Sequence, residues 1–116
     1  MKKLLVLTLI SVVTLVNASS ATKLDRVNRL AGLYGAVTFC TAYYYARKDY
    51  AKEKKIKALG QELAEKIGAL LESYDQYLSA RGEKIIVYFK YYKQPKRIQK
   101  MMCDNLGRHL RGEIDG

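Results

Sequence analysis

Hydrophobic residues recur at intervals of three and four over most of the chain, a spacing that predicts amphipathic helices. The first such segment runs from about Thr22 to Lys57. The apolar positions expected on its inner face are Leu24, Val27, Leu30, Ala31, Tyr34, Val37, Thr38, Thr41 and Tyr45. Over residues 30–46 the other faces are also apolar, or carry only Gly, Thr and Tyr. A helix that is apolar all round lies either at the centre of a bundle or in a membrane, and a core helix is the preferred interpretation.

A second amphipathic segment follows, in which Gly60 marks either a break or a point of close packing. Its apolar stripe consists of Ile56, Leu59, Leu63, Ile67, Leu70, Leu71, Tyr74 and Leu78. Arg81-Gly82 is typical of a helix C-terminus, because glycine readily takes the left-handed conformation of the cap. The pattern therefore predicts one helix that ends near Gly82.

Residues 83–93, EKIIVYFKYYK, fit either a strand or a helix. Their β-branched and aromatic content favours a strand, whereas the spacing of Ile85, Ile86, Phe89 and Tyr92 also fits a helix. A single strand has no partner in an otherwise helical chain, so a helix is predicted.

Pro95 interrupts the preceding segment and is compatible with the first turn of a last helix. That helix is expected to direct inward Ile98, Met101, Met102, Leu106 and Leu110, and residues 112–116 are expected to fray. The fold class predicted is all-α, a small three- or four-helix bundle formed by a single domain of residues 22–111.

The first residues, MKKLLVLTLISVVTLVNASSA, have the layout of a secretory signal peptide. Lys2 and Lys3 supply the positive charge, and residues 4–16 form an apolar run that is short for a membrane span. Small residues before Ala18 predict a signal peptide of residues 1–18, with cleavage after Ala21 as the alternative. A retained N-terminal anchor is the other interpretation. Cleavage predicts an exported protein, periplasmic or secreted, in an oxidising compartment.

Two cysteines, Cys40 and Cys103, remain after that cleavage. A bridge between them would close a loop of roughly 60 residues, which the loop-closure entropy values at about 4 kcal/mol. Two free thiols and an intermolecular bridge are the alternatives, and the bridge requires the two Cα atoms to come within about 7 Å.

The residues that usually carry chemistry do not form a recognisable site. His109 stands six positions from Cys103, which turns the two side chains apart on a helix, and it is expected at the rim of the core. No glycine-rich phosphate-binding motif occurs. The sequence therefore predicts a protein that is not an enzyme, with no metal, no cofactor and no catalytic residue.

Positive charge interleaved with tyrosine is the feature that stands out, in a chain of formal net charge +10. It is concentrated in two clusters. The first contains Tyr44, Tyr45, Arg47, Lys48, Tyr50, Lys52, Lys54, Lys55 and Lys57. The second contains Lys90, Tyr91, Tyr92, Lys93, Lys96, Arg97 and Lys100, preceded by Tyr88.

Cations flanked by aromatic rings suit nucleic acid, an anionic lipid or glycan surface, or an acidic protein. An exported chain meets the envelope before it meets nucleic acid. The leading hypothesis is therefore an exported, non-enzymatic protein that binds an acidic envelope partner, either a protein or anionic lipid, with peripheral membrane association. One alternative is a membrane-embedded small subunit that uses residues 30–45 as a packing or spanning helix, with Gly32, Gly35 and Ala36 as its contact face. Another is a phage-type periplasmic inhibitor of a lytic enzyme, or a lysis regulator.

Overall fold

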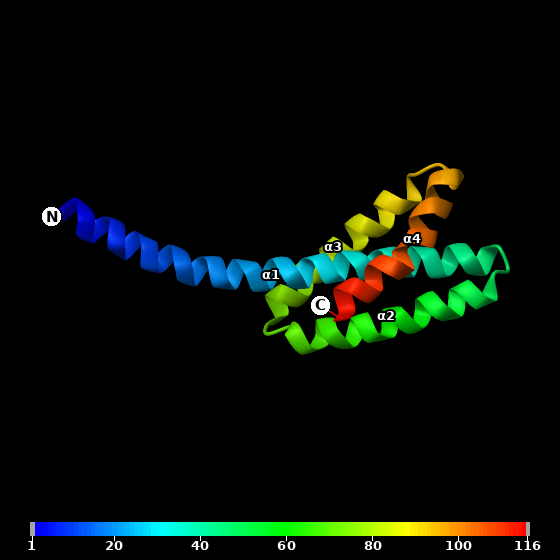
Figure 1. Ribbon diagram of the computed structural model, residues 1–116, viewed down its shortest axis with the longest axis horizontal. Helices are drawn as coiled ribbons and strands as arrows, with labels where there is room; N and C mark the ends of the chain where they lie inside the picture. Colours follow the sequence, from blue (N-terminus) through cyan, green and yellow to red (C-terminus); the bar gives the residue numbers. More distant parts are fainter. Residues whose placement is uncertain (1, 116) are drawn as a thin grey trace.

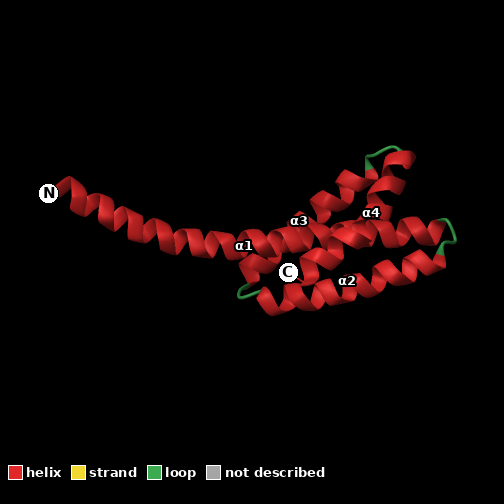
Figure 2. Ribbon diagram, viewed as in Figure 1, coloured by secondary structure: helices red, strands yellow, loops and turns green. Residues whose placement is uncertain are grey.

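A computed structural model describes the backbone of residues 2–115 and the side chains of residues 23–115. The chain forms four helices, α1 (Lys2–Ala46), α2 (Tyr50–Leu70), α3 (Tyr74–Tyr92) and α4 (Lys96–Asp115), and no strand occurs among residues 2–115 (Figures 1 and 2). The all-α class is confirmed, and residues 83–92 are helical. The helix α4 continues through Gly112 to Asp115, where the sequence predicts fraying.

The predicted signal peptide, residues 1–18 with its alternative end at Ala21, lies outside the part of the chain whose side chains are described. The backbone of residues 2–22 belongs to α1. Among the described side chains, burial along α1 begins at Val27. All the buried side chains that the structure describes lie C-terminal to both predicted cleavage positions.

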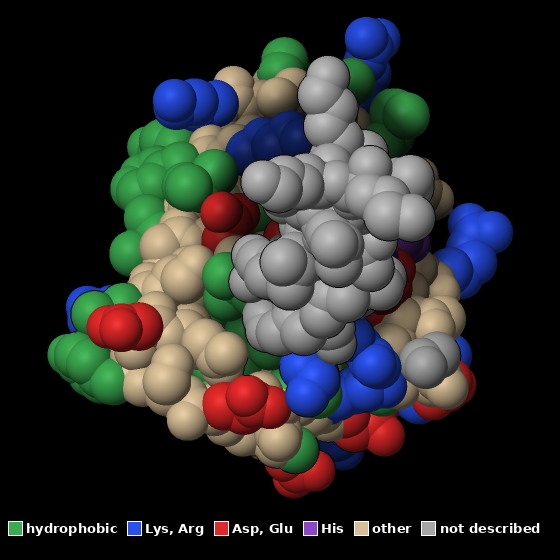
Figure 3. All heavy atoms as spheres, turned by 90° about the vertical axis from the view of Figure 1, so that its left-hand side faces the viewer, with side chains coloured by type: hydrophobic (Ala, Val, Ile, Leu, Met, Phe, Trp, Pro, Cys, Tyr) green, Lys and Arg blue, Asp and Glu red, His purple; other side chains and the backbone are tan. Residues whose placement is uncertain are grey.

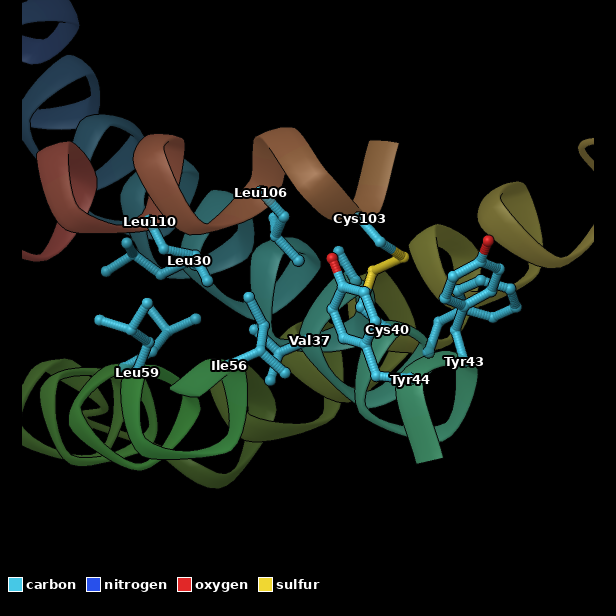
Figure 4. Close-up of a cluster of buried hydrophobic side chains, with 13 residues drawn as sticks. Leu30, Val37, Cys40, Tyr43, Tyr44, Ile56, Leu59, Cys103, Leu106 and Leu110 are labelled. Atoms are coloured by element: carbon cyan, nitrogen blue, oxygen red, sulfur yellow. A yellow bond between two sulfur atoms is a disulfide. The ribbon is translucent and has the colours of Figure 1, made fainter. Parts of the chain in front are cut away.

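The helix α1 is the central element, because its contacts with α3 and α2 are the most extensive in the bundle and it also meets α4. α2 runs back alongside it, and α4 crosses the pair (Figure 1). The main core joins side chains of α1, α2 and α4 (Figure 4). Its buried members are Leu30, Ala36, Val37, Phe39, Cys40, Tyr43, Tyr44, Ile56, Leu59, Leu63, Cys103, Leu106 and Leu110. This placement explains why residues 30–46 of α1 are apolar on every face.

A disulfide joins α1 to α4. Cys40 and Cys103 are paired with a Cα–Cα distance of 5.4 Å, and both residues are almost fully buried. The pairing is the one predicted from the sequence, and it closes a loop across a sequence separation of 63 residues.

The first helix begins and ends earlier in the chain than the predicted segment from Thr22 to Lys57. α1 ends at Ala46, and Lys48 adopts a left-handed conformation with a φ of 60°. The Asp49 side chain then caps α2 by accepting a hydrogen bond from the backbone N–H of Lys52, at 3.3 Å. The prediction of one helix through Lys57 is wrong, because this cap starts a new helix that turns back along α1.

The second predicted helix is also divided. α2 ends at Leu70, and Ser73 caps α3 by accepting a hydrogen bond from the backbone N–H of Gln76, at 3.2 Å. The Gln76 side chain in turn accepts from the backbone N–H of Glu72 at 2.8 Å. These reciprocal bonds resemble a capping box, which satisfies N–H groups that the first turn of a helix leaves unpaired. Gly82 lies inside α3 and does not end a helix.

Glycines allow α1 to approach its neighbours closely. A Cβ atom on Gly35 would lie 2.1 Å from the backbone oxygen of Lys84 in α3, and one on Gly60 would lie 2.6 Å from Cγ1 of Val37. Gly60 is therefore a point of close packing within α2. Gly32 and Gly35 are used in contacts between α1 and α3 within the bundle.

Several residues expected in the core are exposed instead. The two unforeseen turns start new helices, so one apolar stripe does not continue across them, and Tyr44 is held in the core by its hydrogen bond to Asp104 of α4. The exposed residues are Thr38, Tyr45, Tyr74, Leu78, Met101 and His109.

In the part of the chain whose residues are described, none of the helices combines the length and the apolar character that crossing a membrane requires.

Candidate binding surface

The two basic clusters come together at one end of the bundle. Residues 44–57 surround the connection between α1 and α2, and residues 88–100 surround the connection between α3 and α4. Both connections lie at the right-hand end of Figure 1, away from the N-terminus. We call residues 44–57 and 88–100 together the basic end. The fold thus brings to one end of the bundle two segments that residues 58–87 separate in the sequence.

Specific contacts hold the two parts of the basic end in place. The disulfide joins α4 to α1 within two turns of the end of α1 and of the start of α4. The Tyr44 hydroxyl donates to Oδ1 of Asp104 at 2.7 Å, and Nζ of Lys52 lies 3.3 Å from the same oxygen (Figure 4 shows Tyr44 beside the disulfide). The rings of Phe39 in α1 and Tyr91 in α3 are 5.9 Å apart between centroids.

The contact between Tyr44 and Asp104 shifts the proton affinity of both groups. Burial, together with the hydrogen bond to Asp104, raises the pKa of Tyr44 well above its ordinary value. The hydrogen bond from Tyr44 lowers the pKa of Asp104, and the hydrogen bond and charge of Lys52 lower it further. Both shifts favour the neutral phenol and the ionised carboxylate, so this pair has a structural role at neutral pH.

The cations of the first cluster do not share one face. Lys52 and Lys55 line a groove between α2 and α4, whereas Lys57 lines a separate groove between α1 and α2. Two of them already interact with other groups: Lys52 pairs with Asp49 and Asp104, and the Arg47 guanidinium lies 3.6 Å from the centroid of the Tyr43 ring.

The cations of the second cluster have fewer interactions with the rest of the fold than those of the first. Its cations are all exposed, and none forms an ion pair with any of residues 23–115. No Asp or Glu occurs in the sequence between Glu83 and Asp104. The connection between α3 and α4 therefore presents positive charge that this part of the fold does not neutralise. The residues concerned are Lys90, Lys93, Lys96, Arg97 and Lys100.

Most of the site residues predicted from the sequence are exposed at the basic end, and two are not. Tyr44 is 5% exposed and belongs to the core, and Tyr91 is partly buried against Phe39. The exposed residues are Tyr45, Arg47, Lys48, Tyr50, Lys52, Lys54, Lys55, Lys57, Lys90, Tyr92, Lys93, Lys96, Arg97 and Lys100. The sequence analysis placed Tyr44 among the partner-binding residues. In the structure Tyr44 is buried and its hydroxyl donates a hydrogen bond to Asp104.

The sequence analysis did not identify an apolar patch on the outer face of α3. Ile85, Ile86, Phe89 and Tyr92 are 46%, 61%, 49% and 62% exposed. Hydrophobic side chains lie open along the left-hand side of Figure 3, with both basic and acidic side chains near them. We call these four residues the α3 patch. The sequence does contain a signal for this patch, because residues 85–92 carry more apolar side chains than one buried face of a helix can accommodate.

Among residues 23–115 no group of three or more His, Cys, Asp and Glu side chains lies close enough to hold a metal ion. The fold and surface together define a small, disulfide-linked bundle of four helices with a basic, aromatic end. No protein-family model matches the chain, and comparison with curated proteins and with solved structures gives no match. Its function is therefore argued from its own residues.

Proposed function

We propose that this chain is an exported, non-enzymatic protein that binds an acidic envelope partner, a protein or anionic lipid, through its basic end. The observation that carries the proposal is the group of exposed, unpaired cations at the connection between α3 and α4. Opposite charges attract over a distance of about 10 Å at 0.1 M salt, so such a cluster raises the rate of encounter and orients the protein. Exposed Tyr45, Tyr50 and Tyr92 add apolar contact area and hydrogen-bonding hydroxyls beside the cations.

Export is supported by the layout of residues 1–18 and by the buried disulfide, which persists in oxidising compartments. Mass spectrometry of the unreduced protein recovered from producing cells tests this part of the proposal. The expected mass is that of a chain cleaved after Ala18 or Ala21, less the two hydrogen atoms that are lost when the disulfide forms. A chain that keeps its N-terminal segment and both thiols would contradict export.

Binding is tested by washing the envelope fraction of cells that produce the protein. The test variant replaces Lys93, Lys96 and Lys100 with Gln, which removes three exposed cations and no described ion pair. The unaltered protein should stay with the envelope at low salt and be largely released at about 0.5 M salt, because screening weakens contacts between exposed charges. The variant should be released already at low salt.

A matched control removes the same number of charges elsewhere, by replacing Arg26, Arg81 and Arg108 with Gln, none of which forms a described ion pair. These residues lie outside the basic end, so the control should behave like the unaltered protein. Equal release of the two triple variants, or retention of the unaltered protein that salt does not change, would refute the proposal. Correct folding of each variant is checked by its helical circular dichroism and its urea unfolding midpoint.

A further inference from the structure

The outer face of α3 departs from the usual pattern of a surface helix. Ala80 faces inward and is 5% exposed, and Val87 and Tyr91 pack against the core from the same side of the helix. The opposite side would ordinarily be polar. Here it carries the α3 patch, and Leu78, 44% exposed, continues the same line toward the N-terminus of the helix.

None of residues 23–115 covers this patch, because its four side chains each keep about half of their surface or more. Met101, near the start of α4, is a further exposed hydrophobic residue, at 55%. Continuous apolar surface of this kind is uncommon on a monomeric protein and usually marks a site of interaction. The question is which kind of partner it fits.

Charge decides against a second copy of this chain. Lys90 and Lys93 border the patch, and Lys96, Arg97 and Lys100 follow directly. A two-fold contact places the same surface on both subunits, so the cations of both subunits would be gathered at one interface. No carboxylate lies between Glu83 and Asp104 to compensate for them. Repulsion between like charges therefore opposes pairing of two patches.

The same arrangement complements an anionic bilayer. A helix that lies in a membrane interface buries its apolar face a few ångströms below the phosphate groups, and its lysines remain at their level. The patch lies on the outer face of α3, and the C-terminal end of α3 stands out from the pair formed by α1 and α2 (Figure 1). A flat lipid surface accepts a projecting helix face without a preformed groove.

We propose that the α3 patch inserts into the headgroup region of a bilayer that contains anionic phospholipid, with the cations of residues 90–100 bound to phosphate groups. This inference rests on the proposed function and assigns the partner of the basic end to lipid. The C-terminal half of α3 makes the contact. Its N-terminal end does not, because Glu72 and Asp75 place negative charge beside the exposed ring of Tyr74.

The experiment measures binding of the purified, oxidised protein to vesicles of equal parts phosphatidylglycerol and phosphatidylcholine. The test variant carries Ile86→Ser and Phe89→Ser, and its affinity should fall by about tenfold or more, because two large apolar side chains lose their place in the membrane. The control variant Tyr74→Ser removes a ring of similar size from the same helix and should stay within about twofold. Vesicles of phosphatidylcholine alone should bind the unaltered protein weakly, since they lack the net charge.

A second measurement reports insertion directly. The chain has no tryptophan, so Phe89→Trp places a single fluorescent probe in the patch. Its emission should shift to shorter wavelength on anionic vesicles and be quenched by lipids with brominated acyl chains. Emission that stays unchanged while the protein binds would overturn the inference, since the ring would then remain in water.

The remaining outcomes separate this inference from the proposed function. Vesicle binding that depends on Lys93, Lys96 and Lys100, but not on Ile86 and Phe89, would overturn insertion and leave electrostatic docking intact. Retention in the envelope without vesicle binding would identify an acidic protein as the partner and overturn the lipid assignment. A dimer in solution that the double serine variant converts to a monomer would show that a second copy covers the patch, which also overturns the inference.

Discussion

Replacement of Gly35 by alanine tests the closest approach between two helices in the bundle. The new Cβ atom would lie 2.1 Å from the backbone oxygen of Lys84, and 3.0 Å and 3.1 Å from its carbonyl carbon and Cα. The obstacle is the backbone of α3, which cannot rotate away as a side chain can. Ordinary contact therefore requires α1 and α3 to separate by about 1 Å, in a core that tolerates such shifts poorly.

The expected magnitude follows from two opposing effects. Overpacking of this kind costs typically about 1–3 kcal/mol, and a displacement imposed on backbone belongs at the upper end of that range. Alanine is a better helix former than glycine by roughly 0.5–1 kcal/mol, which offsets part of the loss. We expect Gly35→Ala to lower the free energy of unfolding by about 2 kcal/mol.

Urea unfolding at pH 7, followed by far-ultraviolet circular dichroism with the disulfide intact, measures this difference. Gly68→Ala is the matched control, because the added methyl group meets nothing within 4 Å and should raise stability by roughly 0.5–1 kcal/mol. Gly60→Ala should fall between the two, since it meets Cγ1 of Val37 at 2.6 Å, an obstacle that belongs to a side chain and not to the backbone. A Gly35→Ala protein as stable as the Gly68→Ala protein would refute the close packing of α1 on α3.

Three further predictions concern the disulfide, the buried hydrogen bond and a helix cap. Cys40→Ser combined with Cys103→Ser should lower the free energy of unfolding by about 4 kcal/mol, because the bridge spans 63 residues; a loss below about 1 kcal/mol would contradict this value. Burial raises the pKa of Tyr44 above the ordinary 10.0, so the unfolded chain ionises first and stability should fall as pH rises above about 10. The lowered pKa of Asp104 should make stability fall as pH drops below about 4, where the unfolded chain takes up the proton first. Urea unfolding midpoints measured across pH test both effects. Above about pH 10 the midpoint of Tyr44→Phe should change less with pH than that of the unaltered protein. Ser73→Ala should cost about 1 kcal/mol by removing the cap of α3, and unchanged urea unfolding would contradict that role.

The hydrophobic spacing was sufficient to predict helices, and Pro95 located the start of the last one correctly. The ambiguous segment 83–93 was also assigned correctly, because an isolated strand has no partner. The breaks at residues 47–49 and 71–73 were missed, although Ser73 and Gln76 have the spacing of a capping box. Lys48 gave no comparable signal, because lysine has no preference for its left-handed conformation.

The candidate surface was predicted in part. Charge in a sequence is almost always solvated, so the exposure of Lys90, Lys93 and their neighbours follows from composition. The tyrosines were harder, because a phenol suits the core and the surface alike, and neighbours such as Tyr44 and Tyr45 differ by 100° around the helix. Which of these two tyrosines is buried depends on the tertiary structure, because α4 supplies Asp104 as the hydrogen-bond partner of Tyr44.

By itself, the sequence determined that the chain is helical, that its charge is concentrated in two clusters, and that it has two cysteines able to pair. Only the tertiary structure decided that the clusters share one end of the bundle, that Gly35 meets the backbone of α3, and that Ile85, Ile86, Phe89 and Tyr92 are left uncovered. The physical reason is that periodicity defines a helix and its apolar faces. When a helix is apolar on more than one face, the face that becomes buried is chosen by the neighbours that the fold brings to it.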